Sequence, residues 1–387
     1  MIIKDISKLL NQRPLVYFVG AFLSLVLFNT TYMNLGTYVP IIVIIFTIVF
    51  ALSARRSIYK QTYGFLFFSI LVFLSTLLSG GTISREVEKI FLNALIYIIA
   101  SSLFFSEKEV RFLSFVIFVS YLVYAVLVIQ AIGTIGTFYG RVNIVILNSE
   151  YPLDPNVTAS VFTLPVVIGL YNFLYGKFRL VSILGVIVFL VALVACASRG
   201  AFLGLIGVLL LLLHFVSSRK GNILYKSLLI GLVVIAISYA MFYAISDDTL
   251  FGMERILDTS DEDVSNGRLD IWSKRLAFIL QSPVWGYGAN YKIGPIHCAC
   301  HNTFIQILYY GGFFGFFLFF KPIIRMFKRT HVSILVKCAL FASVLMPIFF
   351  IDTLQERTLW NFVIFYELLS RREIGENALV WFKKTQS

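Results

Sequence analysis

The sequence predicts an all-α polytopic membrane protein that forms one integral membrane domain over residues 1–387. Hydrophobic residues make up 59% of the chain and charged residues only 13%, whereas soluble domains are about one quarter charged. Apolar runs of about 17 to 25 residues, long enough to cross a bilayer as a helix, recur along nearly the whole chain. Twelve membrane spans are predicted at residues 14–30, 38–53, 63–79, 87–104, 110–132, 156–175, 180–196, 199–216, 226–245, 301–320, 333–351 and 358–370.

The distribution of basic residues indicates how these spans are oriented. An even number of spans places both termini on one side, and that side holds 22 of the 32 Lys and Arg residues. Because loops that stay in the cytoplasm are enriched in Lys and Arg, both termini are predicted to be cytoplasmic. The net charge of +12 is therefore a feature of topology, and no nucleic acid is expected as a partner.

Residues 246–300 form the longest segment between spans, and they are predicted to lie on the outer, periplasmic side. Long loops in compact proteins are usually functional or disordered. Asn266 is a plausible helix cap and Pro283 a plausible stop. Between them, four apolar residues recur at helical spacing: Leu269, Trp272, Leu276 and Ile279. This pattern is typical of an amphipathic helix on the outer membrane face, and Arg268 and Arg275 share one side of it.

Residues 297–301 read HCACH and place four possible metal ligands in five positions. A tetrahedral site made wholly of these residues is sterically poor, because structural zinc sites combine ligand pairs from separated segments. The acidic run 258–263 does not match an EF-hand, since Asn266 and Trp272 stand where Gly and Glu are needed. We therefore expect no metal and no cofactor. Cys298 and Cys300 are expected as free thiols or as a tight disulfide.

Two predicted helix starts carry residues that suit an anionic substrate. Arg199 follows a capping Ser198 at the start of the eighth span, and His301 begins the tenth. The predicted topology turns both amino ends outward, where unpaired N–H groups and a partial positive charge favour anions. With Arg268 they form a cationic cluster suited to a diphosphate, because Arg binds phosphate through two N–H groups. A neutral histidine there can act as a base.

Each of these residues also has a simpler interpretation. Arg199 can be an interfacial residue that extends to the headgroups, Arg268 can belong to a solvated helix face, and His301 can be a capping or packing histidine. Charged residues are almost absent from the middle of the spans, whereas transporters place ionisable or broken-helix sites near the midplane. The sequence therefore favours chemistry at the outer surface.

These residues resemble the O-antigen ligase and polysaccharide polymerase superfamily of bacterial membranes. Arg199 to Leu203 is similar to the family pattern Arg-x3-Leu. The longer family pattern, His-Asn followed after nine residues by Gly-x-x-Gly, is matched by His301, Asn302, Gly312 and Gly315. Further similarities are Arg268 in GRLDIW with Pro283 and Gly286 after it, the Arg-x10-Gly spacing of Arg275 and Gly286, and LDPN at 153–156.

The resemblance implies a C-type glycosyltransferase fold and glycosyl transfer from an undecaprenyl-diphosphate-linked donor, without nucleotide sugar or metal. It implies that Arg199 and Arg268 bind the diphosphate and stabilise its leaving charge. It further implies that His301 activates the acceptor hydroxyl, giving inversion at the anomeric carbon, or else contacts phosphate. The second group of substrate-binding candidates shares only a predicted outer location: Arg141, Arg275, Asp352 and Arg357.

The expected function is a polymerase that joins lipid-linked repeat units of O-antigen, capsule or exopolysaccharide at the outer face of the bacterial inner membrane. The alternative in the same class is the ligase that transfers finished glycan to lipid A–core. A lipid-linked oligosaccharide flippase or other transporter is the alternative from another class. Membrane lipid, lipid-linked glycans, a chain-length regulator and a flippase are the partners expected.

Overall fold

The computed structural model describes residues 11–12, 14–29, 63–103, 105–131, 137–138, 141–142, 154–196, 198–218, 268–289, 300–371 and 374–381. Within these residues the fold is helical, apart from an isolated bridge and one antiparallel pair of two-residue strands, β1 (Thr137–Phe138) and β2 (Arg141–Val142). The predicted spans 38–53 and 226–245 lie outside the described residues. So do residues 246–267 and 290–299, which include Asn266, His297 and Cys298.

The other ten predicted spans coincide with helices, which confirms the all-helical class. Their bounds are α2 (Pro14–Asn29), α4 (Tyr63–Leu78), α5 (Arg85–Ser102), α6 (Glu107–Ala131), α7 (Pro155–Ser160) with α8 (Thr163–Tyr175), α9 (Arg179–Ala195), α10 (Arg199–Gly204) with α11 (Ile206–Ser218), α15 (Thr303–Arg329), α16 (Ile334–Leu345) with η3 (Pro347–Phe350), and α17 (Arg357–Leu369). Two further elements lie outside the predicted spans: α14 (Arg268–Ile279) and η4 (Glu376–Leu379).

Three helical stretches are long and apolar enough to cross a membrane: Glu107–Ala131, Pro155–Tyr175 and Thr303–Arg329. Shorter apolar helices accompany them among the described residues. Several large apolar side chains face outward, among them Leu180, Leu213 and Phe317, each more than half exposed. Apolar patches of this kind suit contact with lipid, so the chain is an integral membrane protein.

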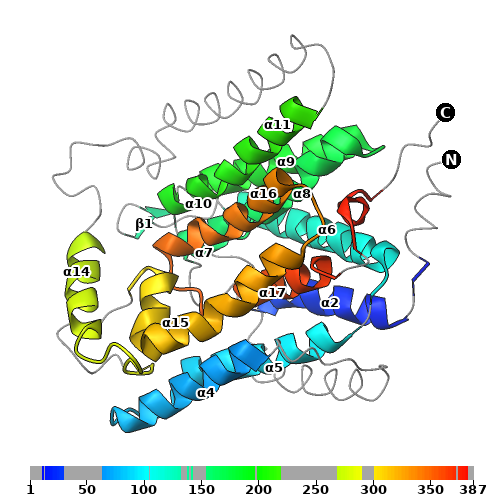
Figure 1. The fold of residues 1–387 in the computed structure, drawn as a ribbon. Coiled ribbons are helices and arrows are strands. Elements are labelled where there is room, and N and C mark those ends of the chain that lie inside the picture. Colours follow the sequence, from blue (N-terminus) through cyan, green and yellow to red (C-terminus); the bar gives the residue numbers. More distant parts are fainter. Residues whose placement is uncertain are drawn as a thin grey trace.

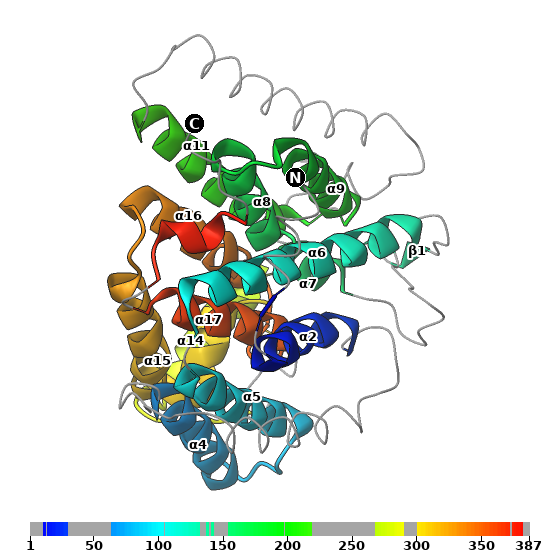
Figure 2. The ribbon, with the colours of Figure 1, turned by 90° about the vertical axis from the view of Figure 1, so that its right-hand side faces the viewer.

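The helices pack as a bundle in which neighbours along the chain are often neighbours in space. In Figures 1 and 2, α4 and α5 lie along one side, and α8, α9 and α11 lie along the other. Helices α2, α6 and α17 fill the space between them, with α17 packed on α5 and α2, and α6 packed on α9. The core is rich in aromatic residues; Phe65, for example, contacts the rings of Phe319 and Trp360.

Helix α15 is not the straight span that the sequence predicts for 301–320. Gly312 has φ 61° and ψ −163°, which breaks the helix. The rings of Phe304 and Phe320 stack with centroids 5.3 Å apart, whereas sixteen residues of straight helix would separate them by about 24 Å. The two halves of α15 therefore fold toward each other at Gly312 (Figure 1).

The turn 283–288, which follows α14, replaces the hydrogen bonds that α15 loses at this break. In an unbroken helix, the carbonyls of Tyr309 and Tyr310 would accept from residues four positions later. Instead they accept from the N–H groups of residues 287 and 288, at 2.8 and 3.0 Å. The N–H groups of residues 313 and 314 donate to the carbonyls of residues 283 and 284, at 2.7 and 3.3 Å. Backbone groups away from water must be paired, so the break and the turn depend on each other.

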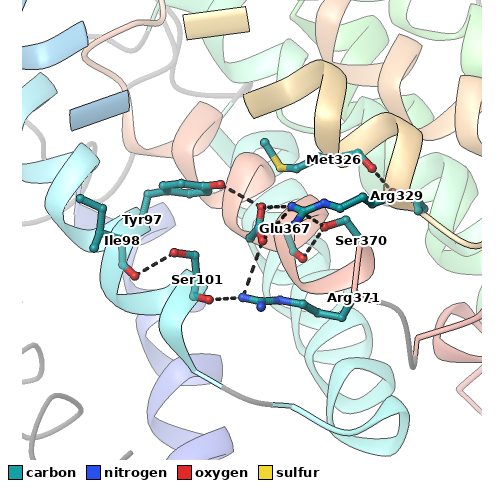
Figure 3. Close-up of polar contacts among 9 residues, drawn as sticks. Tyr97, Ile98, Ser101, Met326, Arg329, Glu367, Ser370 and Arg371 are labelled. Atoms are coloured by element: carbon teal, nitrogen blue, oxygen red, sulfur yellow. Dashed lines mark hydrogen bonds and ion pairs between the residues drawn. The ribbon is translucent and has the colours of Figure 1, made fainter. Parts of the chain in front are cut away.

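A buried ionic cluster joins α5, α15 and α17 at the carboxyl ends of α15 and α17 (Figure 3). Glu367, only 3% exposed, accepts from Arg329 at 3.1 Å and from the Tyr97 hydroxyl at 2.9 Å. Arg371 lies 3.6 Å from the same carboxylate and also donates to the carbonyl of Ser101. One carboxylate therefore links three helices.

Candidate functional site

His301 lies directly before the first helical residues of α15, with Asn302 as the cap. The Asn302 side-chain oxygen accepts from the N–H groups of Phe304 and Ile305, at 2.9 and 3.1 Å. His301 itself is half-buried and has φ 49°. This left-handed conformation is uncommon for residues other than glycine, and such conformations cluster at functional sites.

Asp352 fixes the backbone of His301 in this conformation. Its carboxylate accepts from the N–H groups of His301 and Asn302, at 2.9 and 3.0 Å. Beside it, the hydroxyl of Thr303 donates to the carbonyl of Ile351 at 2.6 Å and accepts from the N–H of Thr353 at 3.0 Å. The start of α15 is thus joined to the segment 349–353.

The environment of Asp352 acts on its charge in two directions. Burial raises the pKa of the Asp352 carboxyl, and the N–H groups of His301 and Asn302 lower it. The first effect is the larger, so the pKa of Asp352 lies above that of an ordinary aspartate. Asp352 was expected as a substrate-binding candidate; in the structure both of its oxygens serve the backbone that carries His301.

The start of α10 packs against the same segment from another side. A Cβ atom added to Gly200 would lie 2.6 Å from the Cβ of Phe350, so the α10 backbone touches η3 directly. Ser198 caps α10 as expected, and its hydroxyl also donates to the side-chain oxygen of Asn156 at 3.0 Å. Asn156 belongs to LDPN, where Asp154 caps α7. The Arg199 backbone therefore lies at this junction, and its side chain is outside the described residues.

Helix α14 reaches the junction through Trp272. The Trp272 indole N–H donates to the carbonyl of Cys300 at 2.8 Å. Its ring lies with its centroid 5.5 Å from that of Phe349 and 6.2 Å from that of Phe350. Trp272 therefore contacts both the residue before His301 and η3, next to Asp352. We call the group formed by Gly200, Trp272, His301, Phe350 and Asp352 the helix-end cluster.

The predicted helix at 266–283 is present as α14, with two differences. It ends at Ile279, four residues before Pro283. Its apolar residues also do not share one membrane face: Ile279 is buried and Trp272 half-buried, whereas Leu269 and Leu276 are 63% and 42% exposed. The inner side of α14, which carries Trp272 and Arg275, packs on protein: Trp272 contacts Cys300 and Phe349, and Arg275 packs on Tyr309.

The two arginines of α14 differ in their surroundings. Arg268 is half-buried at the first position of the helix, about one helical turn before the helix-end cluster residue Trp272. Arg275 is only 1% exposed, and its guanidinium carbon lies 4.4 Å from the ring centre of Tyr309. A Cβ atom on Gly286 would lie 2.5 Å from the Tyr309 carbonyl. Arg275 and Gly286, paired by their sequence spacing, thus both pack on Tyr309.

The remaining candidates are placed only by their backbones. Arg141 lies in β2 and Arg357 is the first residue of α17, and the side chains of both are outside the described residues. Arg357 follows Asp352 by five residues on the chain. Their roles in substrate binding stay predictions, as do those of Arg199 and Arg268.

A chain of polar side chains beside the site, centred on the buried residues Gln306 and Tyr310, has no counterpart in the sequence analysis. The Gln306 amide donates to Gln355 at 3.1 Å and to the Tyr310 hydroxyl at 3.2 Å. The Tyr310 hydroxyl donates to Glu86 at 2.7 Å, and the Gln306 oxygen accepts from the N–H of Leu354 at 3.4 Å. These hydrogen bonds connect the 351–355 segment to Glu86 of α5. In the sequence, this network is indicated only by the polar residues Gln306 and Tyr310 within an apolar run.

The fold and the site define an integral membrane protein in which the starts of α10 and α15 and the inner side of α14 meet around segment 349–353, and this segment holds the backbone of one conformationally constrained histidine. Residues 184–320, roughly a third of the chain, match the family described as O-antigen ligase. The matched segment includes Arg199, Arg268 and His301, and the resemblance to the O-antigen ligase and polymerase superfamily is confirmed for it. A search of curated proteins found no match.

The family match indicates the general class of activity. It supports a glycosyltransferase-like enzyme of O-antigen or related polysaccharide biosynthesis that acts on lipid-linked glycans in a membrane. Asp352 and Arg357 lie beyond the matched segment, and Arg141 lies before it. The contact between Asp352 and His301 therefore comes from the structure alone.

Proposed function

We propose that this protein is a polymerase that joins undecaprenyl-diphosphate-linked oligosaccharide repeat units of O-antigen, capsule or exopolysaccharide. The observation that carries the proposal is the helix-end cluster. It gathers the start of α10, the start of α15 and the inner side of α14 around the 349–353 segment. Helix amino ends and arginines together suit a diphosphate, and the family match supplies the class of reaction.

In the proposed reaction, Arg199 and Arg268 bind the diphosphate of the donor. The acceptor hydroxyl gives its proton to His301 as its oxygen attacks the anomeric carbon. The bond between that carbon and the phosphate oxygen breaks, and undecaprenyl diphosphate leaves with the electron pair. The arginines stabilise the growing negative charge, attack from the opposite face inverts the anomeric carbon, and Asp352 positions His301. A phosphate contact is the alternative role for His301.

The proposal includes a topology. The chain would cross the bacterial inner membrane twelve times as one domain with a C-type glycosyltransferase fold, and both termini would be cytoplasmic. Residues 246–300 would lie on the periplasmic side, with the helix-end cluster near the outer face. A reporter fusion at about residue 260 should be active with an exported phosphatase and silent with a cytoplasmic reporter. The reverse pattern would overturn the orientation and the outer site together.

The ligase is the second candidate, because the matching family is described as O-antigen ligase. Purified full-length protein separates the two. Incubation with the lipid-linked repeat unit alone should yield a ladder of longer glycans if the protein is a polymerase. Transfer that requires added lipid A–core would identify a ligase. Flipping of the lipid-linked glycan without any new glycosidic bond would identify a transporter.

The reaction is proposed to need no metal or other cofactor. The HCACH stretch falls largely outside the described residues. Glycan transfer should survive chelation and the double change Cys298→Ser/Cys300→Ser. Stoichiometric zinc in active protein, lost together with activity on those changes, would contradict this part of the proposal. A chain-length regulator and a flippase are the protein partners proposed.

A further inference from the structure

Three hydroxyl side chains at the end of α4 bind the segment that follows α14. Ser75 donates to the carbonyl of Trp285 at 2.8 Å. Ser79 donates to the carbonyl of Tyr287 at 2.8 Å. Thr76 accepts from the N–H of residue 289 at 2.9 Å. We call Ser75, Thr76 and Ser79 the α4 hydroxyl cluster. It lies outside the family-matched residues 184–320 and more than 200 positions away in sequence.

The fit between α4 and this segment is close. Gly288 has φ 67°, and a Cβ atom added there would lie 2.2 Å from the backbone nitrogen and the hydroxyl of Thr76. A side chain would therefore collide with α4 itself. The Thr76 hydroxyl also donates to the carbonyl of Val72 at 2.7 Å, which orients its lone pair toward residue 289. The segment thus lies between α4 on one side and the break in α15 on the other.

Tyr287 connects this segment to α14. Its ring stacks on that of Phe278 with centroids 4.4 Å apart, and its hydroxyl donates to the Phe278 carbonyl at 3.3 Å. It also stacks on Tyr309, the residue that packs on Arg275. The contacts run from Ser79 through Tyr287 and Phe278 into α14, the helix that begins with Arg268.

We propose that Ser75, Thr76 and Ser79 are positioning residues that hold α14, and with it Arg268, against α15. The proposal assigns a role in donor binding to α4, and it rests on the proposed function for the part played by Arg268. Ser75 and Ser79 bond to the segment that follows α14, and they take no direct part in the proposed reaction. Their effect is on the placement of the arginine, and small displacements of a binding group can lower rates by about a hundredfold.

The test compares the double change Ser75→Ala/Ser79→Ala with Ser69→Ala. Ser69 is the matched control, because it is a buried serine of the same helix whose hydroxyl donates to the Leu66 carbonyl in its own helix. The full-length protein is purified in lipid nanodiscs. The donor is the lipid-linked glycan extracted from a strain that lacks this protein. The measurements are the KM and kcat for donor and for acceptor, and amide hydrogen exchange of residues 268–289.

The double change should raise the donor KM and lower kcat/KM for the donor by about ten- to a hundredfold, and should leave the acceptor KM unchanged. Exchange in residues 268–289 should rise, and Ser69→Ala should do neither. A loss of folded protein alone would lower kcat and leave both KM values as they were. Thr76→Val should act like the double change, and Thr76→Ser, which keeps the hydroxyl, should restore the wild-type values.

Two results would overturn the proposal: unchanged exchange in residues 268–289, or increased exchange there with an unchanged donor KM. The first means that the hydroxyls do not hold α14, and the second means that holding α14 does not place the donor. Failure of the proposed function looks different, because the wild-type protein would then form no glycosidic bond. The exchange comparison would still decide whether the α4 hydroxyl cluster holds α14.

Discussion

Asp352 and His301 lie 51 positions apart in sequence, and the Asp352 carboxylate accepts the His301 N–H at 2.9 Å where φ of His301 is 49°. The second carboxylate oxygen accepts from Asn302 at 3.0 Å. A backbone held in this way orients the imidazole before substrate arrives. Reactions that need an aligned acceptor and base gain from such pre-organisation.

The change Asp352→Asn should lower glycan transfer by about ten- to a hundredfold and leave protein levels normal. An amide replaces one of the two carboxylate oxygens with an NH2 donor, so one of the two N–H groups loses the oxygen that it bonds to in the wild-type protein. The measurement is the initial rate of transfer by purified protein. Asp270→Asn is the control, because Asp270 is 62% exposed on α14 and pairs with Lys274 on the surface. Equal effects of both changes would contradict a specific role for Asp352.

Acidification should move stability and activity in opposite directions. Burial raises the pKa of Asp352 above its unfolded value. A carboxyl of this kind stabilises the fold fully below the unfolded pKa, about 3.9, and this contribution is lost as pH rises through the folded pKa. The Tm of wild type relative to Asp352→Asn should therefore increase as pH falls from neutral. Activity should fall over the same range, because a protonated carboxyl accepts the two N–H groups less well. A Tm difference independent of pH would contradict this assignment.

Gly312→Ala should release the turn 283–288 from α15. An added Cβ would lie 2.3 Å from the Val284 carbonyl, at a backbone φ of 61°. Gly80→Ala isolates the cost of the backbone alone, because Gly80 has φ 74° with nothing within 4 Å of the added atom. The free energy of unfolding should fall by about 1 kcal/mol in that control and by several times as much in Gly312→Ala. Proteolysis near residue 285 should also be faster in Gly312→Ala. Similar losses for both would mean that the turn does not depend on Gly312.

Glu367→Gln should destabilise the protein by about 3 kcal/mol or more, because removing one member of a buried ion pair leaves the others uncompensated. Arg329 and Arg371 both lie within 4 Å of this carboxylate (Figure 3). Glu107→Gln is the control: it breaks a partly exposed pair with Arg111, where losses stay below about 1 kcal/mol. Thermal unfolding in detergent is the measurement, and equal shifts in Tm would show that the cluster is not stabilising.

Local patterns were sufficient to predict the spans that fall on described residues, with their starts placed to within three residues. Ser198 caps α10 and the helix after His301 begins within two residues of the predicted span, because capping side chains act on N–H groups two or three positions away. The break at Gly312 was predicted as continuous helix. Its φ is determined by hydrogen bonds to residues 283–288, and an apolar run with glycines gives no indication of such a partner.

The site could be predicted only where family motifs mark it. The sequence placed Arg199 and His301 at helix starts, but it could not show that Trp272 bonds to Cys300, or that Phe350 and Asp352 lie between those starts. Such contacts depend on how residues 28 to 150 positions apart pack together. The sequence analysis placed the apolar residues of α14 on one membrane face, whereas the structure divides them between a buried and an exposed side. Hydrophobic spacing alone does not show whether an apolar face packs on a neighbouring helix or on lipid.

The last prediction concerns the residues proposed to act on the substrate. Arg199→Ala, Arg268→Ala and His301→Ala should each lower transfer by about a hundred- to a thousandfold, the usual cost of removing one contact to a developing charge. Protein levels and membrane insertion should stay normal. Arg→Lys changes should restore activity only in part, because Lys keeps the charge and loses the planar fork.

Two controls decide whether these effects are specific. Lys274 is a cation of the same helix as Arg268, but it is 54% exposed and paired with Asp270, so Lys274→Ala should be nearly silent. His297→Ala, four residues before His301 and outside the family motif, should be mild. The measurement is glycan chain formation by purified protein from the lipid-linked repeat unit. If Lys274→Ala matched Arg268→Ala, general positive charge would explain the losses. If His297 were essential and His301 dispensable, the assignment of the base to His301 would be wrong, because that assignment rests on the contact of His301 with Asp352 at the start of α15.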